Sequence, residues 1–204
     1  VNELIASKYE TAAETLNKIP VKKLESDFDK QRYYYLLGMV QVKSNKIDEA
    51  IFNFELVLTQ FATTSANIYL AMTTAGMALA YYKRDDPERA ARLTDRAVRL
   101  IDNKKLIGSL HQWALIYCQL GELYSNLGSY KDSKDIVERG IELCREHDSL
   151  FILDELYLIR GKDELALGED KQAKETLEIA RSISIARRES FVKDEIAAEL
   201  KKLK

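Results

Sequence analysis

Four stretches of the chain repeat one pattern of small residues, and this repeat constrains the fold more than any other feature. In each stretch, a small residue with apolar neighbours is followed twelve positions later by a second small residue. The four pairs are Gly38 and Ala50, Ala78 and Ala90, Gly121 and Ser133, and Gly161 and Ala173. A turn sequence such as KSNKID or KRDDPE separates the members of each pair. The pattern predicts a helix, a tight turn and a second helix, repeated along the chain.

The glycines inside these helical stretches need a physical reason. Glycine costs a helix about 1 kcal/mol relative to alanine, yet it recurs at the same place in three of the four units. Two helices can approach closely only where a side chain is missing. We therefore expect Gly38, Gly121 and Gly161 to lie where the first helix of a unit packs against the second, with no role in chemistry.

The composition also favours helices joined by short turns. Hydrophobic residues make up 46% of the 204 residues and charged residues 31%, which is typical of a globular chain. Only two Pro and eight Gly occur, which leaves few positions for turns and almost none for a flexible linker. The net charge of −2 provides no overall field that would attract nucleic acid.

Cysteine usage and hydropathy point to a cytoplasmic protein. Cys118 and Cys144 are too few for a disulfide framework, and their spacing fits no zinc site. A reducing compartment is therefore the simplest interpretation. No apolar run reaches the roughly 18 residues of a membrane span, and the first residues lack the apolar core of a signal peptide. We expect no membrane contact and no cofactor.

The units resemble the tetratricopeptide (TPR) repeat, in which aromatic residues, Leu-Gly and a small–apolar–small series recur at fixed spacing. The third unit matches best, at Tyr117, Leu120, Gly121, Tyr124, Leu127, Gly128, Tyr130 and Ser133. The first unit matches at Tyr34, Leu37, Gly38, Ala50 and Phe54. The units begin near residues 31, 71, 114 and 154, so they are longer than the usual repeat of about 34 residues.

The repeat predicts an all-α fold, a right-handed TPR-like superhelix of antiparallel helix pairs in a single domain over residues 1–204. The predicted segments are a partial repeat at 1–30, repeats at about 31–66, 67–107, 108–150 and 151–186, and a cap helix at 187–204. The stretch from Thr63 to Lys83 reads as one long helix. The chain opens within a repeat, so we expect a further segment before Val1.

The long units and the stretch FDKQRYYYLLGMVQVKSNKIDEAIFNFELVL resemble one particular set of TPR domains. These are the C-terminal sensor domains of Xre-type, peptide-pheromone-responsive bacterial transcription regulators, of the Rgg, NprR, PlcR and PrgX kind. The resemblance implies a short linear peptide as ligand, a homodimer, and DNA binding only through a helix-turn-helix domain that these residues do not contain. The alternative is a general protein–protein interaction scaffold or adaptor.

The family resemblance also implies a site, because the first helices of TPR units line a groove. The groove positions of the family correspond here to Arg32, Tyr35, Met39, Tyr82, Lys83, Cys118, Gln119, Glu122, Asn126 and Lys162. The Tyr, Met and Cys side chains would form an apolar floor, and the polar groups would fix the direction of the peptide. Met39, Leu79 and Leu158 can equally be core residues. Tyr35 and Met39 replace the Lys and Asn of the chaperone-binding class, which disfavours that class.

The sequence offers no residues for catalysis or metal binding. His111 and His147 lie in different units, without a Cys or carboxylate at ligand spacing. No nucleophile elbow, phosphate loop or dinucleotide motif occurs. The acidic pairs Asp85–Asp86 and Asp154–Glu155 precede or open predicted helices, where negative charge complements the helix dipole. We therefore expect a protein that is not an enzyme.

One charge pattern has two interpretations. Arg89, Arg92, Arg96 and Arg99 are spaced by 3, 4 and 3 positions and therefore share one face of a helix. The simpler interpretation is a solvated outer face, interleaved with Glu88 and Asp95. The other is a binding stripe for an acidic partner or a phosphate backbone.

Overall fold

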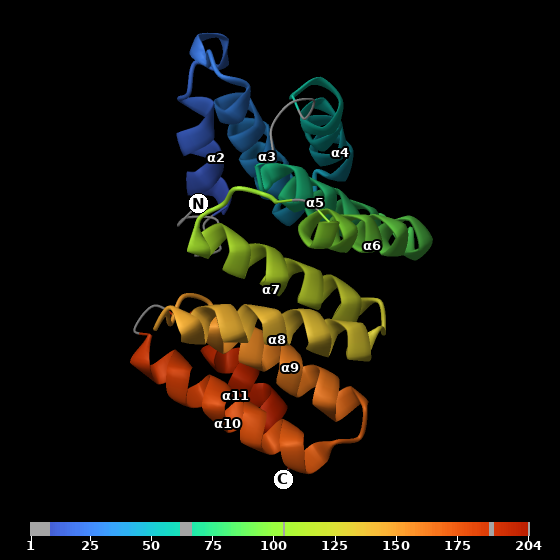
Figure 1. Cartoon of the computed structure of the whole chain (residues 1–204), viewed down its shortest axis with the longest axis vertical. Helices are drawn as coiled ribbons and strands as arrows, with labels where there is room; N and C mark the ends of the chain where they lie inside the picture. The colour runs from blue at the N-terminus through green and yellow to red at the C-terminus, as the bar shows by residue number, and fades with distance from the viewer. Residues whose placement is uncertain (1–8, 62–66, 104, 188–189, 204) are drawn as a thin grey trace. The chain divides into compact units, whose positions relative to one another are not determined.

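The computed structural model describes residues 9–61, 67–103, 105–187 and 190–203, and its regular elements are helices (Figure 1). Within these ranges there are ten α-helices and no β-strand. The prediction of an all-α fold is confirmed. None of the helices in the described ranges is both long and apolar enough to cross a membrane.

The chain divides into two compact units, residues 1–107 and 108–204, called here the N-terminal and C-terminal units. The N-terminal unit contains α2 (Tyr9–Asn17), a 3-10 turn η1 (Val21–Lys23), α3 (Asp27–Lys43), α4 (Ile47–Leu56), a π-helical turn η2 (Val57–Phe61), α5 (Tyr69–Lys83) and α6 (Pro87–Asn103). The C-terminal unit contains α7 (Leu110–Asn126), α8 (Tyr130–Glu146), α9 (Leu153–Ala166), α10 (Asp170–Ala186) and α11 (Lys193–Lys201). The predicted single domain and its repeat boundaries stay predictions.

The turns within the helix pairs share one geometry. Asn45, Asp85, Gly128 and Gly168 each stand two positions after the last residue of the first helix, with φ of 61°, 64°, 78° and 76°. The next residue in each turn donates its N–H to a carbonyl in the last turn of that helix, at 2.8 to 3.0 Å. This is the Schellman arrangement, which satisfies carbonyls that the helix end leaves unpaired. The Asn, Asp and Gly residues of the predicted turns therefore stand where the backbone needs a positive φ.

The glycines of α3, α7 and α9 allow the paired helices to approach closely. A Cβ atom at Gly38 would lie 2.5 Å from the ring of Phe54 in α4, and one at Gly161 would lie 2.7 Å from Leu177 in α10. A Cβ at Gly121 would overlap Val137 in α8. Real Cβ atoms do not approach other atoms so closely. The expected packing role of the three glycines is confirmed.

The long helix predicted from Thr63 to Lys83 is wrong at its start, because α5 begins at Tyr69. Asn67 instead forms an isolated parallel bridge with Ile107, and the Ile68 N–H donates to the Ile107 carbonyl at 3.0 Å. The side chain of Asn67 accepts the Tyr69 N–H at 2.9 Å. This competing use of backbone and side-chain groups prevents helix at 67–68. Residues 62–66 lie outside the described ranges.

Polar side chains fix the start of α3 and α5 in the N-terminal unit. Gln31 is 2% exposed, and its amide nitrogen donates to the Phe61 carbonyl. The Asn67 amide donates to the Gln31 side-chain oxygen at 2.5 Å. Gln31 therefore ties η2 and the residues before α5 to α3. The N-cap Ser26 accepts the Asp29 N–H at 3.1 Å and so begins α3.

Exchanging residues at the left-handed turn positions should shift stability in opposite directions. Gly128→Ala should lower the free energy of unfolding by about 1 kcal/mol, because a left-handed backbone disfavours a Cβ by about that amount. Apart from its chain neighbours, no described residue lies within 4 Å of a Cβ at this position, so steric overlap does not contribute. Asp85→Gly should raise the free energy of unfolding for the same reason. Urea titration followed by circular dichroism measures both values.

The matched control is Gly168→Ala, which has the same backbone conformation and equally open surroundings. Its free energy of unfolding should fall by as much as that of Gly128→Ala. A Gly128→Ala variant as stable as the parent, or an Asp85→Gly variant less stable than it, would contradict this account of the turns.

Candidate functional site

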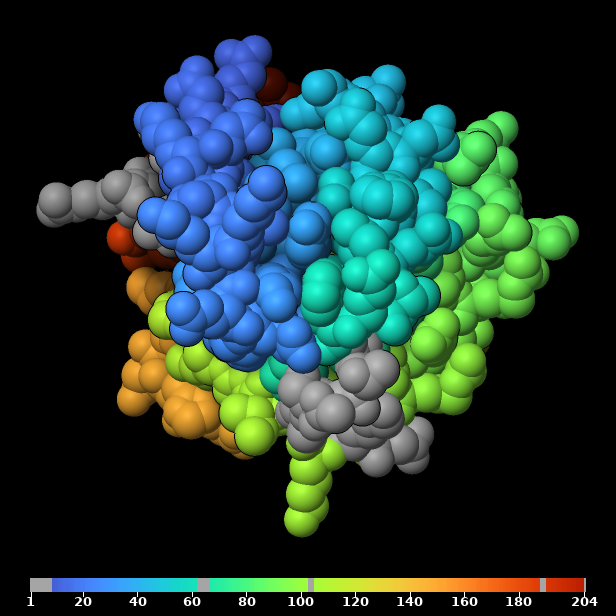
Figure 2. Space-filling model, turned by 90° about the horizontal axis from the view of Figure 1, so that it is seen from above, coloured from blue at the N-terminus to red at the C-terminus, as the bar shows by residue number. Residues whose placement is uncertain are grey.

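An apolar cleft of about 370 Å³ lies between α2 and α3 in the N-terminal unit. Its apolar lining comes from Ala12, Leu16, Ile19, Leu24, Leu36 and Val40. Thr15, Asp29, Arg32 and Tyr33 complete the lining with polar groups. Figure 2 looks onto this unit, with α2 and α3 in blue beside α4 in blue-green. We call this hollow the α2/α3 cleft.

The polar groups of the α2/α3 cleft differ in their freedom to meet a ligand. The Asp29 carboxylate is already engaged, because the Ser26 hydroxyl donates to it at 2.6 Å. Arg32 is exposed, and within the described residues its guanidinium forms no ion pair. Tyr33 is buried, and burial together with the neighbouring Tyr34 raises its pKa. Arg32 is therefore the group of the cleft best placed to bind an anion.

The ten residues predicted to form one peptide groove are divided equally between the two units. The N-terminal unit carries Arg32, Tyr35, Met39, Tyr82 and Lys83. The C-terminal unit carries Cys118, Gln119, Glu122, Asn126 and Lys162. A single groove formed by all ten stays a prediction. Each set is described below within its own unit.

In the N-terminal unit, the predicted floor residues Tyr35 and Met39 are buried, at 6% and 7% exposure. The Tyr35 ring packs against Phe54 and Tyr69, and this burial raises its pKa. Met39, Leu79 and Leu158 all have the low exposure of core residues, which agrees with the alternative interpretation of these three. The side chains accessible to a ligand in this set are therefore those of the remaining three residues.

Those three are Arg32, Tyr82 and Lys83. Arg32 lines the α2/α3 cleft, and Tyr82 is half-buried at the end of α5. Lys83 is exposed, and its ammonium donates to the Val42 carbonyl at 3.3 Å. This bond joins the C-terminal ends of α3 and α5.

In the C-terminal unit, four of the predicted residues lie on α7 and one on α9. Glu122 and Asn126 are exposed, whereas Cys118 and Gln119 are half-buried. Cys118 packs against the apolar core of α7, α8 and α9. Lys162 donates to Glu195 of α11 at 2.9 Å, and although burial opposes its charge, this bond and nearby carboxylates raise its pKa. A ligand at Lys162 would compete with Glu195.

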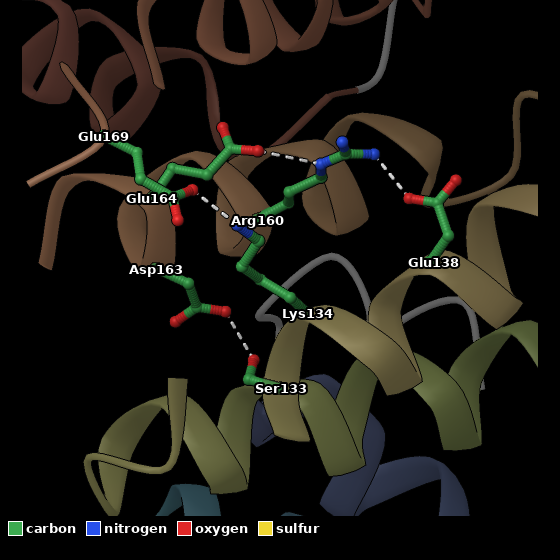
Figure 3. A network of polar contacts seen from close by, with 7 residues as sticks. All are labelled: Ser133, Lys134, Glu138, Arg160, Asp163, Glu164 and Glu169. Carbon is green, nitrogen blue, oxygen red and sulfur yellow. Dashed lines mark hydrogen bonds and ion pairs between the residues drawn. The ribbon is translucent and has the colours of Figure 1, made fainter. Parts of the chain in front are cut away.

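A polar network that the sequence did not reveal lies inside the C-terminal unit (Figure 3). The Ser133 hydroxyl of α8 lies 2.9 Å from the Gly121 carbonyl of α7 and 2.5 Å from Asp163 Oδ2 of α9. Ser133 and Asp163 are both fully buried. A hydroxyl has one hydrogen, so Ser133 can donate to both acceptors only in turn. The three atoms link three helices.

Charged side chains surround this buried link. Arg160 donates from Nε to Glu164 at 3.0 Å and from Nη1 to Glu138 (Figure 3). Lys134 donates to Glu169 at 2.5 Å, which connects α8 to the turn before α10. Each charge therefore has an opposite partner within the unit. The network connects α8, α9 and the residue before α10.

The pKa of Asp163 is raised, and burial is the main cause. Hydrogen bonds from Ser125 and Ser133 and the charges of Lys162 and Lys134 oppose the rise without cancelling it. A protonated Asp163 can donate to the Ser133 oxygen, which leaves the Ser133 hydrogen for the Gly121 carbonyl. Protonation therefore satisfies both contacts of Ser133 at once.

A second buried acid in the C-terminal unit connects the start of α9 to the residues after α10. Asp154, the second residue of α9, is fully buried and pairs with Arg187, and the Ser190 hydroxyl also donates to it. We expected Asp154 only to complement the helix dipole. Its partners lie 33 and 36 positions later, beyond any local sequence signal. Within the described ranges, no group of three His, Cys, Asp or Glu residues could hold a metal ion.

The comparisons with known proteins agree with the repeat. The family model described as tetratricopeptide repeat matches residues 31–64 and 114–147. Both segments are tetratricopeptide repeats. The first segment covers most of α3 and all of α4. The second covers α7 from Ala114 onward and all of α8. Together the two segments make up about a third of the chain. No curated protein sequence matches the chain.

Solved structures extend the similarity to most of the chain. The apo form of RapI is 14% identical, with a TM-score of 0.62, over 95% of this chain and 53% of that one. BtubC (BKLC) from P. vanneervenii is 18% identical, with a TM-score of 0.64, over 88% of this chain and 72% of that one. This chain spans about half the length of RapI. Identities this low establish the fold alone, and the predicted TPR-like helical-repeat fold is confirmed.

Removing the Asp163 charge should flatten the pH dependence of stability. A raised folded-state pKa means that its stabilising contribution is complete below the ordinary aspartate pKa. That contribution is lost as the pH rises through the folded-state value. Asp163→Asn should abolish this loss, with a gain at neutral pH of about 1.4 kcal/mol for each unit of pKa rise. Urea titrations between acidic and neutral pH measure the difference between the two proteins.

The control is Asp135→Asn, which changes an exposed carboxylate on the same helix as Ser133. Its stability curve should follow that of the parent protein. If the free energy of unfolding changed with pH equally in the parent and in Asp163→Asn, Asp163 would not carry the raised pKa.

Proposed function

We propose that this chain is the ligand-sensing and dimerisation domain of a bacterial transcription regulator. In this proposal it is a cytoplasmic, non-enzymatic TPR module that binds a short linear peptide. The two TPR segments, the long units and the resemblance to peptide-responsive regulators support it. DNA binding would belong to a domain outside these residues.

The α2/α3 cleft is the observation that carries the proposal. Its volume of about 370 Å³ falls within the roughly 300–1,000 Å³ of ligand pockets. The apolar lining suits one or two apolar peptide side chains, and Arg32 at its edge suits a carboxylate of the same peptide. Arg32 is also the residue common to this cleft and the predicted groove. An apolar peptide with a terminal or side-chain carboxylate fits these features.

The rest of the predicted groove enters the proposal as a set of direction-fixing contacts. In the N-terminal unit, Tyr82 offers a half-buried ring and Lys83 an exposed ammonium. A wrong ligand that covered such a polar group without pairing it would lose about 1–3 kcal/mol of binding free energy. Polar groups at the groove would therefore select among peptides of similar hydrophobicity.

A general scaffold or adaptor remains the alternative function. A scaffold would bind segments of folded partners and would have no fixed relation to a DNA-binding domain. A helix-turn-helix encoded directly before Val1 would favour the regulator. A homodimer is part of the regulator proposal, and its mass should appear in light scattering at micromolar concentration.

Replacing Arg32 should weaken peptide binding without loss of fold. The probe is a synthetic peptide selected from a displayed library of random short linear peptides against the 204-residue chain. Calorimetric titration should show at least about tenfold weaker binding to Arg32→Ala, because a charge-assisted hydrogen bond contributes about 1.5–3 kcal/mol. Circular dichroism should be unchanged, since Arg32 is exposed.

The matched control is Lys46→Ala, which removes an exposed positive charge from the α3–α4 turn, outside the cleft lining. It should bind the peptide as the parent does. Equal losses in both variants would reduce the effect to general electrostatics, and an unchanged affinity in Arg32→Ala would place the ligand elsewhere.

A further inference from the structure

A second hollow in the N-terminal unit lies between α5 and α6, away from the α2/α3 cleft. Its volume is about 350 Å³. Met77, Tyr81 and Leu93 supply its apolar lining, and Arg89, Arg92, Arg96 and Arg99 supply the rest. No carboxylate is among the lining residues. We call it the arginine groove, and we propose that it binds an acidic linear peptide segment of a protein partner.

The length of the groove fits such a segment. The four arginines span ten residue steps of α6, from 89 to 99, which correspond to about 15 Å at 1.5 Å per step. An extended peptide covers that distance with about four or five residues at 3.3–3.6 Å each. Arginines at spacings of 3, 4 and 3 form a continuous row on one helix face. Alternate peptide carboxylates can therefore each meet a guanidinium.

The arginines are positioned by contacts that a ligand can use or displace. The Arg89 guanidinium lies over the Tyr81 ring, 4.6 Å from its centroid, which leaves its N–H edge available. Arg89 also lies 3.7 Å from Asp86, and Arg92 lies 3.8 Å from Glu88. Both ion pairs are exposed, and such pairs contribute only about 0–1 kcal/mol. A peptide carboxylate can replace them at little cost.

The choice of arginine suits carboxylates. All four basic residues of α6 are arginines, although lysines outnumber arginines in the chain as a whole. The planar guanidinium presents paired donors that match the two oxygens of a carboxylate, which a lysine ammonium cannot do. A solvated helix face would gain nothing from this preference.

The surroundings favour a short acidic peptide over a nucleic acid. The α6 helix also carries Glu88, Asp95 and Asp102, and Asp85 and Asp86 precede it. These charges would repel a phosphate backbone that continued past the groove. The apolar lining of Met77, Tyr81 and Leu93 suits leucine-like side chains between the acids. A segment that mixes glutamates with apolar residues satisfies both parts of the groove.

The test uses fluorescein-labelled synthetic peptides in which glutamate and leucine alternate at different spacings. Fluorescence anisotropy measures their binding to the 204-residue chain. We expect saturable binding of at least one spacing, and at least tenfold weaker binding to the double variant Arg92→Gln and Arg96→Gln. Peptides with glutamine in place of glutamate should not bind. Both substituted arginines are exposed, and circular dichroism verifies the fold.

The matched control is the double variant Arg145→Gln and Arg181→Gln, which makes the same charge change at exposed positions of the C-terminal unit. It should bind as the parent does. Equal weakening in both double variants, or no saturable binding at any spacing, would overturn the proposal. Tighter binding of a single-stranded oligonucleotide of equal charge, lost in the α6 variant, would overturn it in favour of nucleic acid.

Discussion

Close contact between the two helices of a pair requires that one side chain be missing, and the rest of the structure depends on this constraint. Gly38, Gly121 and Gly161 each face a large apolar side chain sixteen positions later, in the second helix. The second helix pair, α5 with α6, keeps the same spacing with Ala78 and Thr94, both fully buried. A larger first residue thus occurs with a smaller second one. Because interiors are close-packed, a larger residue at the first position of this crossing leaves less room at the second.

The close approach also determines where polar groups can lie. In the C-terminal unit, the small residue of α8 is Ser133, whose hydroxyl reaches both the Gly121 carbonyl and Asp163. A buried acid at that position would be costly without such a partner. The surface functions proposed for the N-terminal unit use different residues. The α2/α3 cleft and the arginine groove are each lined partly by buried core side chains, such as Leu16 and Met77, and partly by exposed arginines.

The local features of the fold could be predicted from the sequence, and its long-range contacts could not. Spacing of twelve between Gly121 and Ser133 fixes a helix, turn and helix, because both residues act within one pair. The late start of α5, after Asn67, depends on Ile107, forty positions away. Burial of Tyr35 depends on Phe54 and Tyr69, so a rule based on groove positions cannot reveal it. The partnership of Ser133 with Asp163 spans thirty positions in the same way.

A double-mutant cycle at Gly161 and Leu177 tests the central claim most directly. Gly161→Ala in the parent should lower the free energy of unfolding by about 1–3 kcal/mol, because the new methyl group overpacks against Leu177. In the Leu177→Ala background the methyl group has room, so the same substitution should be neutral or stabilising through the better helix propensity of alanine. Urea titration of the four proteins gives the coupling energy. An equal loss in both backgrounds would contradict the claim that the missing side chain sets the approach of the helices.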